Sequence, residues 1–376
     1  FYNKISSYID GKRPSYIFYL SLLTLIFVNI FFYRLAEHGT DRSAMILIMI
    51  AVIELLNLAN NEKYDDKTTF LRLPILLTLI VSLKTFYILY VFLFVSVIFT
   101  FIKKKISFVF FLKSSITYFC IVMLCLLLTV NLFNSGCLLY PVKILCFESL
   151  SWAIPISEVE QMNLWYQQWA KAGATPNYRV ENPEIYIKNF NWVNNWFNQY
   201  FFNKVLDFLA GLIFLSLVVF AIFYSKNNQE IKKPKYLLIY SILIILTFEW
   251  FYLIPALRYG GYHLIALLFF IPLSVYLTKY LISLQLLRKK VHFLILLTIF
   301  IFCSRNMLRL NQEYDVYDYN IFNNAYYRSA EQNFTIYNNI KNLNKCYIEN
   351  DLTACPESHI KVKYLNKSYI YYRKNK

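Results

Sequence analysis

The sequence predicts an all-α polytopic membrane protein with about eight or nine transmembrane or half-spanning helices. Hydrophobic residues make up 58% of its 376 residues, whereas charged residues make up only 16%. A soluble domain carries about 25% charged residues, so this chain has too few charges to cover a surface exposed to water. Apolar runs long enough to cross a hydrocarbon core of ~30 Å recur along the chain, separated by polar loops.

The apolar runs define the predicted spans and the domains. A helix rises ~1.5 Å per residue, so runs of this length each cross one bilayer. We expect residues 1–304 to form a transmembrane domain with a central external loop over 135–203, and residues 305–376 to form a small external α/β domain. The end of that tail, HIKVKYLNKSYIYYRK, alternates like two strands around a turn. The predicted spans are 16–33, 43–59, 73–102, 115–133, 205–224, 236–253, 263–282 and 291–303.

The basic residues set the predicted orientation. The net charge of +16 is concentrated in short clusters at 103–105, 226–235 and 288–290, between apolar runs. Cytoplasmic loops carry such an excess of Lys and Arg, so the long loop and the C-terminal tail are predicted to be external. A nucleic-acid-binding surface would show a basic stripe interleaved with aromatic residues, and the sequence has none.

The apolar run over 73–102 contains one charge, Lys84, and admits two topologies. As one long helix, it would place six basic residues of the N-terminal region outside and two inside. As a broken hairpin that turns near Lys84, it reverses that bias and agrees with the positive-inside rule. We therefore predict the hairpin, with Lys84 near the external surface.

Four of the seven cysteines fall in the predicted external segments, as two pairs whose members are nine residues apart: Cys137 with Cys146, and Cys346 with Cys355. Two local pairs in an oxidising compartment are typical of disulfides. Free thiols remain the alternative. The other three cysteines lie in spans and are interpreted as small apolar residues.

The long external loop holds five of the six tryptophans. Trp165 and Trp169 are four residues apart, as are Trp192 and Trp196, so on a helix each pair shares one face. Such a helix either anchors the loop at the membrane interface or offers a platform on which a sugar ring stacks.

Polar groups at membrane depth are functional candidates because they are costly there. The loop RLAEHGTDR offers Glu37 and Asp41 as candidate general bases for a hydroxyl, with His38 and Arg42 as substrate-binding candidates. The alternative is a capped loop in which Asp41 or Thr40 caps the next helix. Lys84 either binds a phosphate or extends to the interface.

The segment FYLIPALRYGGYHLIALLFFIPL provides a further candidate site. Pro255 and the Gly260–Gly261 pair break the helix and let the backbone approach a ligand. Arg258 would bind a lipid phosphate in bidentate fashion, and Tyr259, Tyr262 and His263 accompany it. His263 has a structural role as its alternative.

Several classes of function are excluded by what the sequence lacks. It has no Walker loop, no G-x-G-x-x-G and no metal-ligand spacing among its four histidines, which argues against ATP-driven transport and nicotinamide chemistry. We expect no cofactor, with the need for a divalent metal left open. The chain opens FYNKISSYIDGKRP without a Met, so we expect it to lack its natural N-terminus.

Four stretches together resemble the bacterial type-C (GT-C) glycosyltransferases. They are HGTD before a span, SLKTFYILY in a broken hairpin, NLFNSGCLLYPV at the start of the long loop, and PALRYGGYHLIALLFFIPL late in the chain. The resemblance implies a GT-C-like fold in the bacterial inner (cytoplasmic) membrane, with the loop and the C-terminus on the periplasmic side. It also implies an inverting transfer from a polyprenyl-phosphate-linked sugar to a lipid or glycan acceptor in cell-envelope polysaccharide assembly. A carboxylate would deprotonate the acceptor, while basic side chains stabilise the departing lipid phosphate.

Two other functions remain open. One is an O-antigen-type polymerase of lipid-linked glycans, although its large external loop would lie nearer the C-terminus. The other is a non-enzymatic transporter, flippase or assembly protein, although the sequence shows no internal repeat or paired broken helices.

Overall fold

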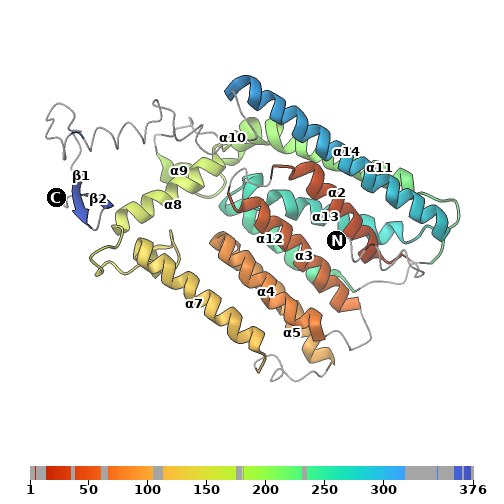
Figure 1. Cartoon of the computed structure of the whole chain (residues 1–376), viewed down its shortest axis with the longest axis horizontal. Coiled ribbons are helices and arrows are strands. Elements are labelled where there is room, and N and C mark those ends of the chain that lie inside the picture. The colour runs from red at the N-terminus through yellow and green to blue at the C-terminus, as the bar shows by residue number, and fades with distance from the viewer. Residues whose placement is uncertain are drawn as a thin grey trace. The chain divides into compact units, whose positions relative to one another are not determined.

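The computed structural model describes residues 5, 14–34, 39–60, 67–104, 113–174, 180, 182–230, 235–317, 345, 360–365 and 368–373. The chain divides into two compact units, Phe1–Phe302 and Cys303–Lys376. The elements, shown in Figure 1, are α2 (Tyr16–Phe31), α3 (Asp41–Asn60), α4 (Lys67–Leu83), η1 (Thr85–Phe92), α5 (Leu93–Lys104), α7 (Ser115–Ser135), η2 (Lys143–Leu145), α8 (Ile156–Lys171), α9 (Pro183–Ile187), α10 (Val193–Trp196), η3 (Phe197–Val205), α11 (Leu206–Phe223), α12 (Leu237–Leu253), η4 (Leu257–Tyr259), α13 (Gly261–Leu277), α14 (Leu284–Tyr317), β1 (Ile360–Leu365) and β2 (Ser368–Arg373).

Every predicted apolar run forms one or more helices, so the helical class is confirmed. Within the described chain, four helical segments are long and apolar enough to cross a membrane: Asp41–Asn60, Ser115–Ser135, Val193–Phe223 and Leu284–Val316. Shorter apolar helices accompany them. This combination is that of a helical membrane protein.

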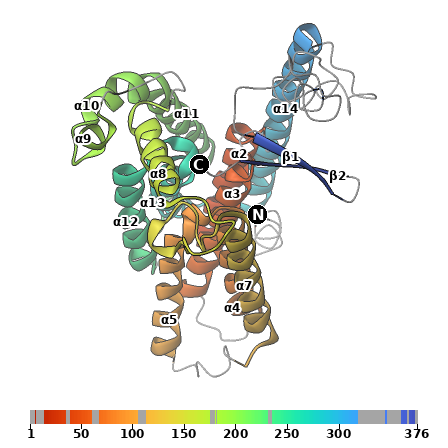
Figure 2. The same cartoon turned by 90° about the vertical axis from the view of Figure 1, so that its left-hand side faces the viewer.

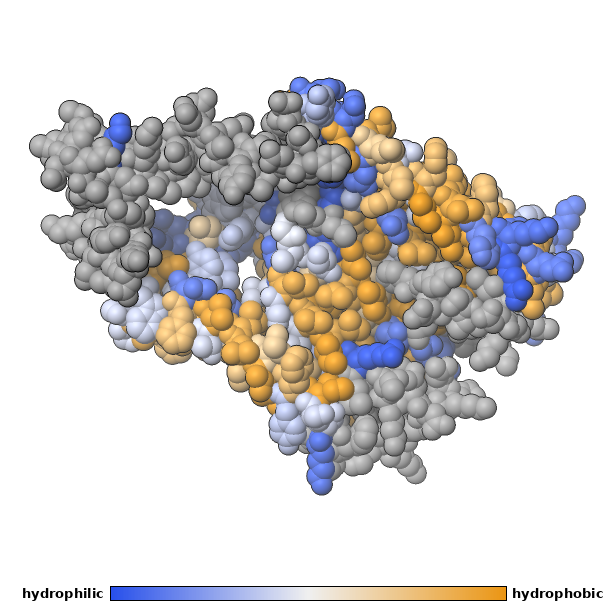
Figure 3. All heavy atoms as spheres, viewed as in Figure 1, coloured by the Kyte–Doolittle hydropathy of each residue, from blue (hydrophilic) through white to orange (hydrophobic). Residues whose placement is uncertain are grey.

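The core of the first unit lies where α2, α3 and α13 pack together. Most of α2 is buried, and its Phe27 makes an edge-to-face contact with Phe270 of α13, with ring centroids 5.7 Å apart. The outer helices instead expose large apolar side chains, seen as orange patches in Figure 3, as a lipid-facing surface would. They include Phe119 and Leu126 of α7, Phe214 and Leu217 of α11, and Phe293 and Phe300 of α14.

The predicted break near Lys84 is confirmed. α4 ends at Leu83, Lys84 is extended at φ −152° and ψ 106°, and η1 follows at once. From this break α4 and α5 both extend toward the same end of the unit (Figure 2) and both pack against α3. The segment therefore forms a broken hairpin.

Contacts between helix termini define the two ends of the first unit. At one end, the Thr40 hydroxyl donates to the Leu83 carbonyl over 2.7 Å, which joins the start of α3 to the end of α4. At the other end, the backbone N–H of Lys235 donates to the Asn60 side chain over 2.9 Å, which joins the end of α3 to the start of α12. This second end, called the basic end below, carries Lys226, Lys235, Lys279 and the residues 288–290.

The second unit contains an antiparallel hairpin of β1 and β2, paired from Ile360 with Arg373 to Leu365 with Ser368. The two strands predicted around NKS are therefore confirmed. The predicted Cys346–Cys355 pair lies outside the described residues.

Candidate functional site

Three charged side chains from distant parts of the sequence meet at the end of the unit opposite the basic end. Lys84 Nζ lies 2.5 Å from Asp41 Oδ1, and Arg258 Nε lies 3.5 Å from Asp41 Oδ2. The Asp41 side chain is 2% exposed, whereas those of Lys84 and Arg258 are 30% and 32% exposed. The structure thus brings together three residues that the sequence offered as separate candidates, and the cluster carries two cations on one buried carboxylate.

The ends of two helices place Asp41 and Lys84. Asp41 is the first residue of α3, where the positive end of the helix dipole favours a carboxylate. The hydrogen bond from Thr40 to Leu83 fixes that helix start beside the break at Lys84. The start of α3 and the break at Lys84 therefore lie next to each other.

The turn that carries Arg258 is held by buried aromatic side chains. Trp250 Nε1 donates to the Ala256 carbonyl over 2.9 Å, and Trp196 Nε1 donates to the Pro255 carbonyl over 2.8 Å. The Tyr200 hydroxyl accepts from the backbone N–H of residue 257 over 2.9 Å. The turn is thus tied to α12 and to the α10–η3 segment.

The two glycines of the turn have separate uses. Gly260 has φ 142°, a conformation that L side chains rarely adopt. At Gly261, a Cβ atom would lie 2.4 Å from Cζ2 of Trp250, so only glycine lets the turn approach this ring.

Aromatic rings hold both cations of the cluster. The Arg258 guanidinium lies 5.0 Å from the ring centroid of Trp169 and 4.7 Å from that of Tyr259, and its Nη2 donates to the Tyr259 hydroxyl over 2.9 Å. Lys84 Nζ lies 5.1 Å from the same Tyr259 ring. These cation–π contacts fix the orientation of the cations. Burial raises the pKa of Tyr259, so its hydroxyl stays protonated.

A cavity of about 830 Å³ opens beside Lys84 and Arg258. This volume is within the usual range of ligand pockets. The walls combine the two cations with apolar, aromatic and amide side chains from η1, α8, α12 and the loop after α7. The lining residues are Lys84, Thr85, Phe86, Ile88, Leu89, Leu139, Tyr140, Pro141, Val142, Asn163, Trp165, Tyr166, Gln167, Trp169, Glu249, Leu253, Ile254, Arg258 and Tyr259.

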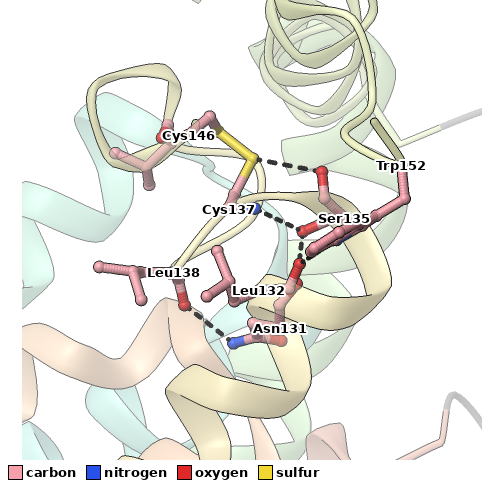
Figure 4. The surroundings of a disulfide bond; sticks show 8 residues. Asn131, Leu132, Ser135, Cys137, Leu138, Cys146 and Trp152 are labelled. Atoms are coloured by element: carbon pink, nitrogen blue, oxygen red, sulfur yellow. Dashed lines mark hydrogen bonds between the residues drawn. A yellow bond between two sulfur atoms is a disulfide. The ribbon is translucent and has the colours of Figure 1, made fainter. Parts of the chain in front are cut away.

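A disulfide closes the loop that forms one cavity wall. Cys137 and Cys146 are bonded, as one of the two sequence alternatives predicted, and their loop contributes residues 139–142 to the lining. Figure 4 shows how the end of α7 supports it: the Ser135 hydroxyl donates to the Asn131 carbonyl over 2.8 Å and accepts from the Cys137 N–H over 3.2 Å. Trp152 Nε1 donates to the Leu132 carbonyl over 3.2 Å on the same helix end.

The predicted aromatic helix is present as α8. The rings of Trp165 and Trp169 stack with centroids 6.5 Å apart and line the cavity, which agrees with the platform alternative. The other pair is different, because Trp192 and Trp196 are 0% and 3% exposed. An exposed anchor or platform at that pair is therefore wrong, and Trp196 supports the Arg258 turn instead.

Other predicted site residues lie away from this cavity. His263 is fully buried and bonds the Tyr90 hydroxyl through Nε2 over 2.6 Å, which agrees with its structural alternative. Tyr262 packs against the rings of Phe32 and Phe208. Arg42 donates to the Arg34 carbonyl. None of the three lines the cavity, so contact with a ligand there is not supported. Glu37 and His38 lie outside the described residues.

Sequence reasoning missed Glu249, the carboxylate among the described residues that line the cavity. This carboxylate lies in α12 within the run TFEWFYL, which we interpreted only as part of a span. A lone charge in an apolar run is a functional signal and could have revealed it.

Lys171, near the Arg258 turn, is a buried cation at the end of α8. Its Nζ donates to the Ile187 carbonyl over 3.2 Å and lies 5.4 Å from the ring centroid of Trp192. Burial lowers the pKa of Lys171 to about 8. The residue joins α8 to the end of α9.

The described residues contain no group of three or more His, Cys, Asp or Glu side chains that could hold a metal ion. The cluster and cavity can instead bind an anion at the cations, a ring at the tryptophans and an apolar chain along η1.

The chain belongs to the family described as Domain of unknown function (DUF8201), whose model matches residues 1–265. That match includes α2 to α12, the disulfide loop and all three members of the charged cluster. No curated protein and no solved structure matches the chain.

Proposed function

We propose that this protein is a GT-C-like glycosyltransferase that takes its sugar from a polyprenyl phosphate at the external face of the membrane. The observation that carries the proposal is the pairing of Lys84 and Arg258 at one cavity. Asp41 balances only one of their two charges, so the cluster keeps a net positive charge for a phosphate. As the sugar leaves, negative charge grows on the lipid phosphate, and two fixed cations stabilise it.

The walls of the cavity suit the other parts of such a donor. Trp165 and Trp169 present a stacked aromatic surface from α8, on which the apolar face of a sugar ring packs. Ile88, Leu89 and Leu253 line the same cavity with aliphatic surface. A polyprenyl chain entering from the hydrocarbon region would meet these side chains.

Two independent observations support an external position for this cavity. The disulfide between Cys137 and Cys146 in its wall is typical of an oxidising compartment. The basic end of the unit lies opposite, as the positive-inside rule expects of a cytoplasmic face. With this orientation, the apolar helices give eight or nine crossings of a bacterial inner membrane, and the cavity faces the periplasm. The product would enter cell-envelope glycan assembly.

Binding of undecaprenyl phosphate to the full chain in lipid nanodiscs tests the proposal. We expect Arg258→Ala to weaken binding by about 10- to 100-fold, because a hydrogen bond to a charged group contributes about 1.5–3 kcal/mol. Lys279→Ala, which removes a cation from the basic end, is the matched control and should bind like the wild type. Undecaprenol, which lacks the phosphate, should bind weakly to all three proteins.

Two results would contradict the proposal. One is equal binding of undecaprenyl phosphate and undecaprenol by the wild type. The other is an Arg258→Ala protein that binds the phosphate as tightly as the Lys279→Ala control.

A further inference from the structure

Among the described residues that line the cavity, Glu249 is the one carboxylate, because Asp41 lies behind Lys84 and Arg258 and does not line it. In α12, residues 239, 243, 246 and 250 are buried and form the core-facing stripe of the helix. Glu249 and Leu253, one turn apart, lie beside this stripe and both line the cavity. No hydrogen bond or ion pair engages the Glu249 carboxylate within the part of the chain that the structure describes, and its side chain is partly exposed.

Asp41 is poorly placed to take a proton from a substrate. Its side chain is 2% exposed, both of its oxygens face cations, and it does not line the cavity. A general base must reach the proton that it accepts, directly or through one water. Glu249 meets the requirement of access, since it lines the same space as Lys84 and Arg258 without pairing with either.

We propose that Glu249 is the catalytic carboxylate of this cavity and accepts the proton of the acceptor hydroxyl. The inference rests on the proposed function. In the step, the acceptor O–H proton passes to the Glu249 carboxylate and the acceptor oxygen forms a bond to the anomeric carbon of the sugar. The bond from that carbon to the phosphate oxygen breaks, and its electron pair stays on the lipid phosphate beside Lys84 and Arg258.

The groups around Glu249 agree with a step in which this carboxylate takes the proton and the two cations hold the phosphate. The other charged or titratable groups that line the cavity are Lys84, Arg258, Tyr140, Tyr166 and Tyr259. Behind the wall, Tyr90 also interacts electrostatically with Glu249. The two cations are already shared with Asp41 on one side of the cavity. A donor held there by its phosphate has Glu249 as the carboxylate that lines the same cavity.

Carbodiimide labelling tests this role without knowledge of the sugar, because N,N′-dicyclohexylcarbodiimide reacts with a carboxyl group that has taken up a proton. We expect Glu249 of the full chain in nanodiscs to be labelled, as read by peptide mass spectrometry, and Asp41 to remain unlabelled. Undecaprenyl phosphate should reduce labelling of Glu249 at least five-fold, whereas undecaprenol should not. Labelling of Asp41 in place of Glu249, or labelling of Glu249 that bound undecaprenyl phosphate leaves unchanged, would overturn the assignment.

A second measurement separates this inference from the proposed function. Glu249→Gln should bind undecaprenyl phosphate within about two-fold of the wild type. The rate at which it releases undecaprenyl phosphate from synthetic undecaprenyl-phosphate-linked hexoses should be at least 100-fold lower than that of the wild type. Glu249→Asp should retain part of that release. If the wild type fails to bind undecaprenyl phosphate, the proposed function fails. If the wild type binds it and Glu249→Gln releases it at the wild-type rate, only the role of Glu249 fails.

Discussion

Removal of Lys84 should destabilise the protein more than removal of its partner Asp41. In Lys84→Met, the Asp41 carboxylate, which is 2% exposed, keeps Arg258, at 3.5 Å, as its one counter-charge among the described residues. Loss of one partner from a buried ion pair lowers the free energy of unfolding by about 3–5 kcal/mol. Because Arg258 remains, we expect Lys84→Met to lose ~3 kcal/mol. Asp41→Asn instead leaves two cations that are 30% and 32% exposed and can regain water, so we expect a loss of ~1–2 kcal/mol.

The free energy of unfolding in mixed detergent micelles, from SDS titration followed by tryptophan fluorescence, measures these differences. Lys143→Met is the matched control, because it removes the exposed pair of Lys143 with Glu160 and should cost no more than ~1 kcal/mol. The double variant Asp41→Asn/Lys84→Met should be about as stable as Asp41→Asn alone, since position 41 no longer carries a buried carboxylate. An Asp41→Asn protein less stable than Lys84→Met would show that the buried Asp41 carboxylate does not depend on Lys84.

Two further predictions concern the packing around the Arg258 turn. Gly261→Ala places a Cβ 2.4 Å from the Trp250 ring and should lower the free energy of unfolding by about 1–3 kcal/mol. Gly211→Ala is the control and should lower it less, because its Cβ would lie 3.2 Å from the tip of the Phe31 ring. Thermal unfolding in detergent compares the two variants, and equal losses of stability would contradict the close approach at Gly261. Burial lowers the pKa of Lys171 from its ordinary value of 10.5 to about 8, so the folded protein binds fewer protons than the unfolded chain between these values. The cost of burying the charged Lys171 side chain is therefore full below pH 8 and falls as the pH rises to 10.5. The wild type should gain stability relative to Lys171→Met over that pH range. A stability difference that is constant with pH would show that Lys171 titrates normally.

The sequence predicted the parts of this fold that depend on local pattern. Apolar runs gave the helices, Lys84 gave the break, and the spacing of Cys137 and Cys146 allowed their disulfide. Charge bias across the bilayer also predicted the broken hairpin that turns at Lys84, because it decided between two topologies of one apolar run.

What the sequence did not reveal depends on which face of a helix meets the core. Trp165 with Trp169 and Trp192 with Trp196 have the same spacing, yet only the first pair lines the cavity. The span predicted over 291–303 is part of a 34-residue helix, since its polar flanks also favour helix.

The structure also changes which carboxylate is the better candidate base. The sequence favoured the acidic loop before α3, where Asp41 is enclosed by its two cations. Glu249 was hidden in an apolar run, and only the packing of α12 places it at the cavity. The catalytic role of either residue stays a prediction.

A cryo-EM structure of the full chain in nanodiscs with undecaprenyl phosphate tests the proposed phosphate site most directly. We expect phosphate density between Lys84 Nζ and the Arg258 guanidinium, with the polyprenyl chain along η1. Phosphate density at the basic end, with the cavity beside Lys84 and Arg258 empty, would contradict the proposed site.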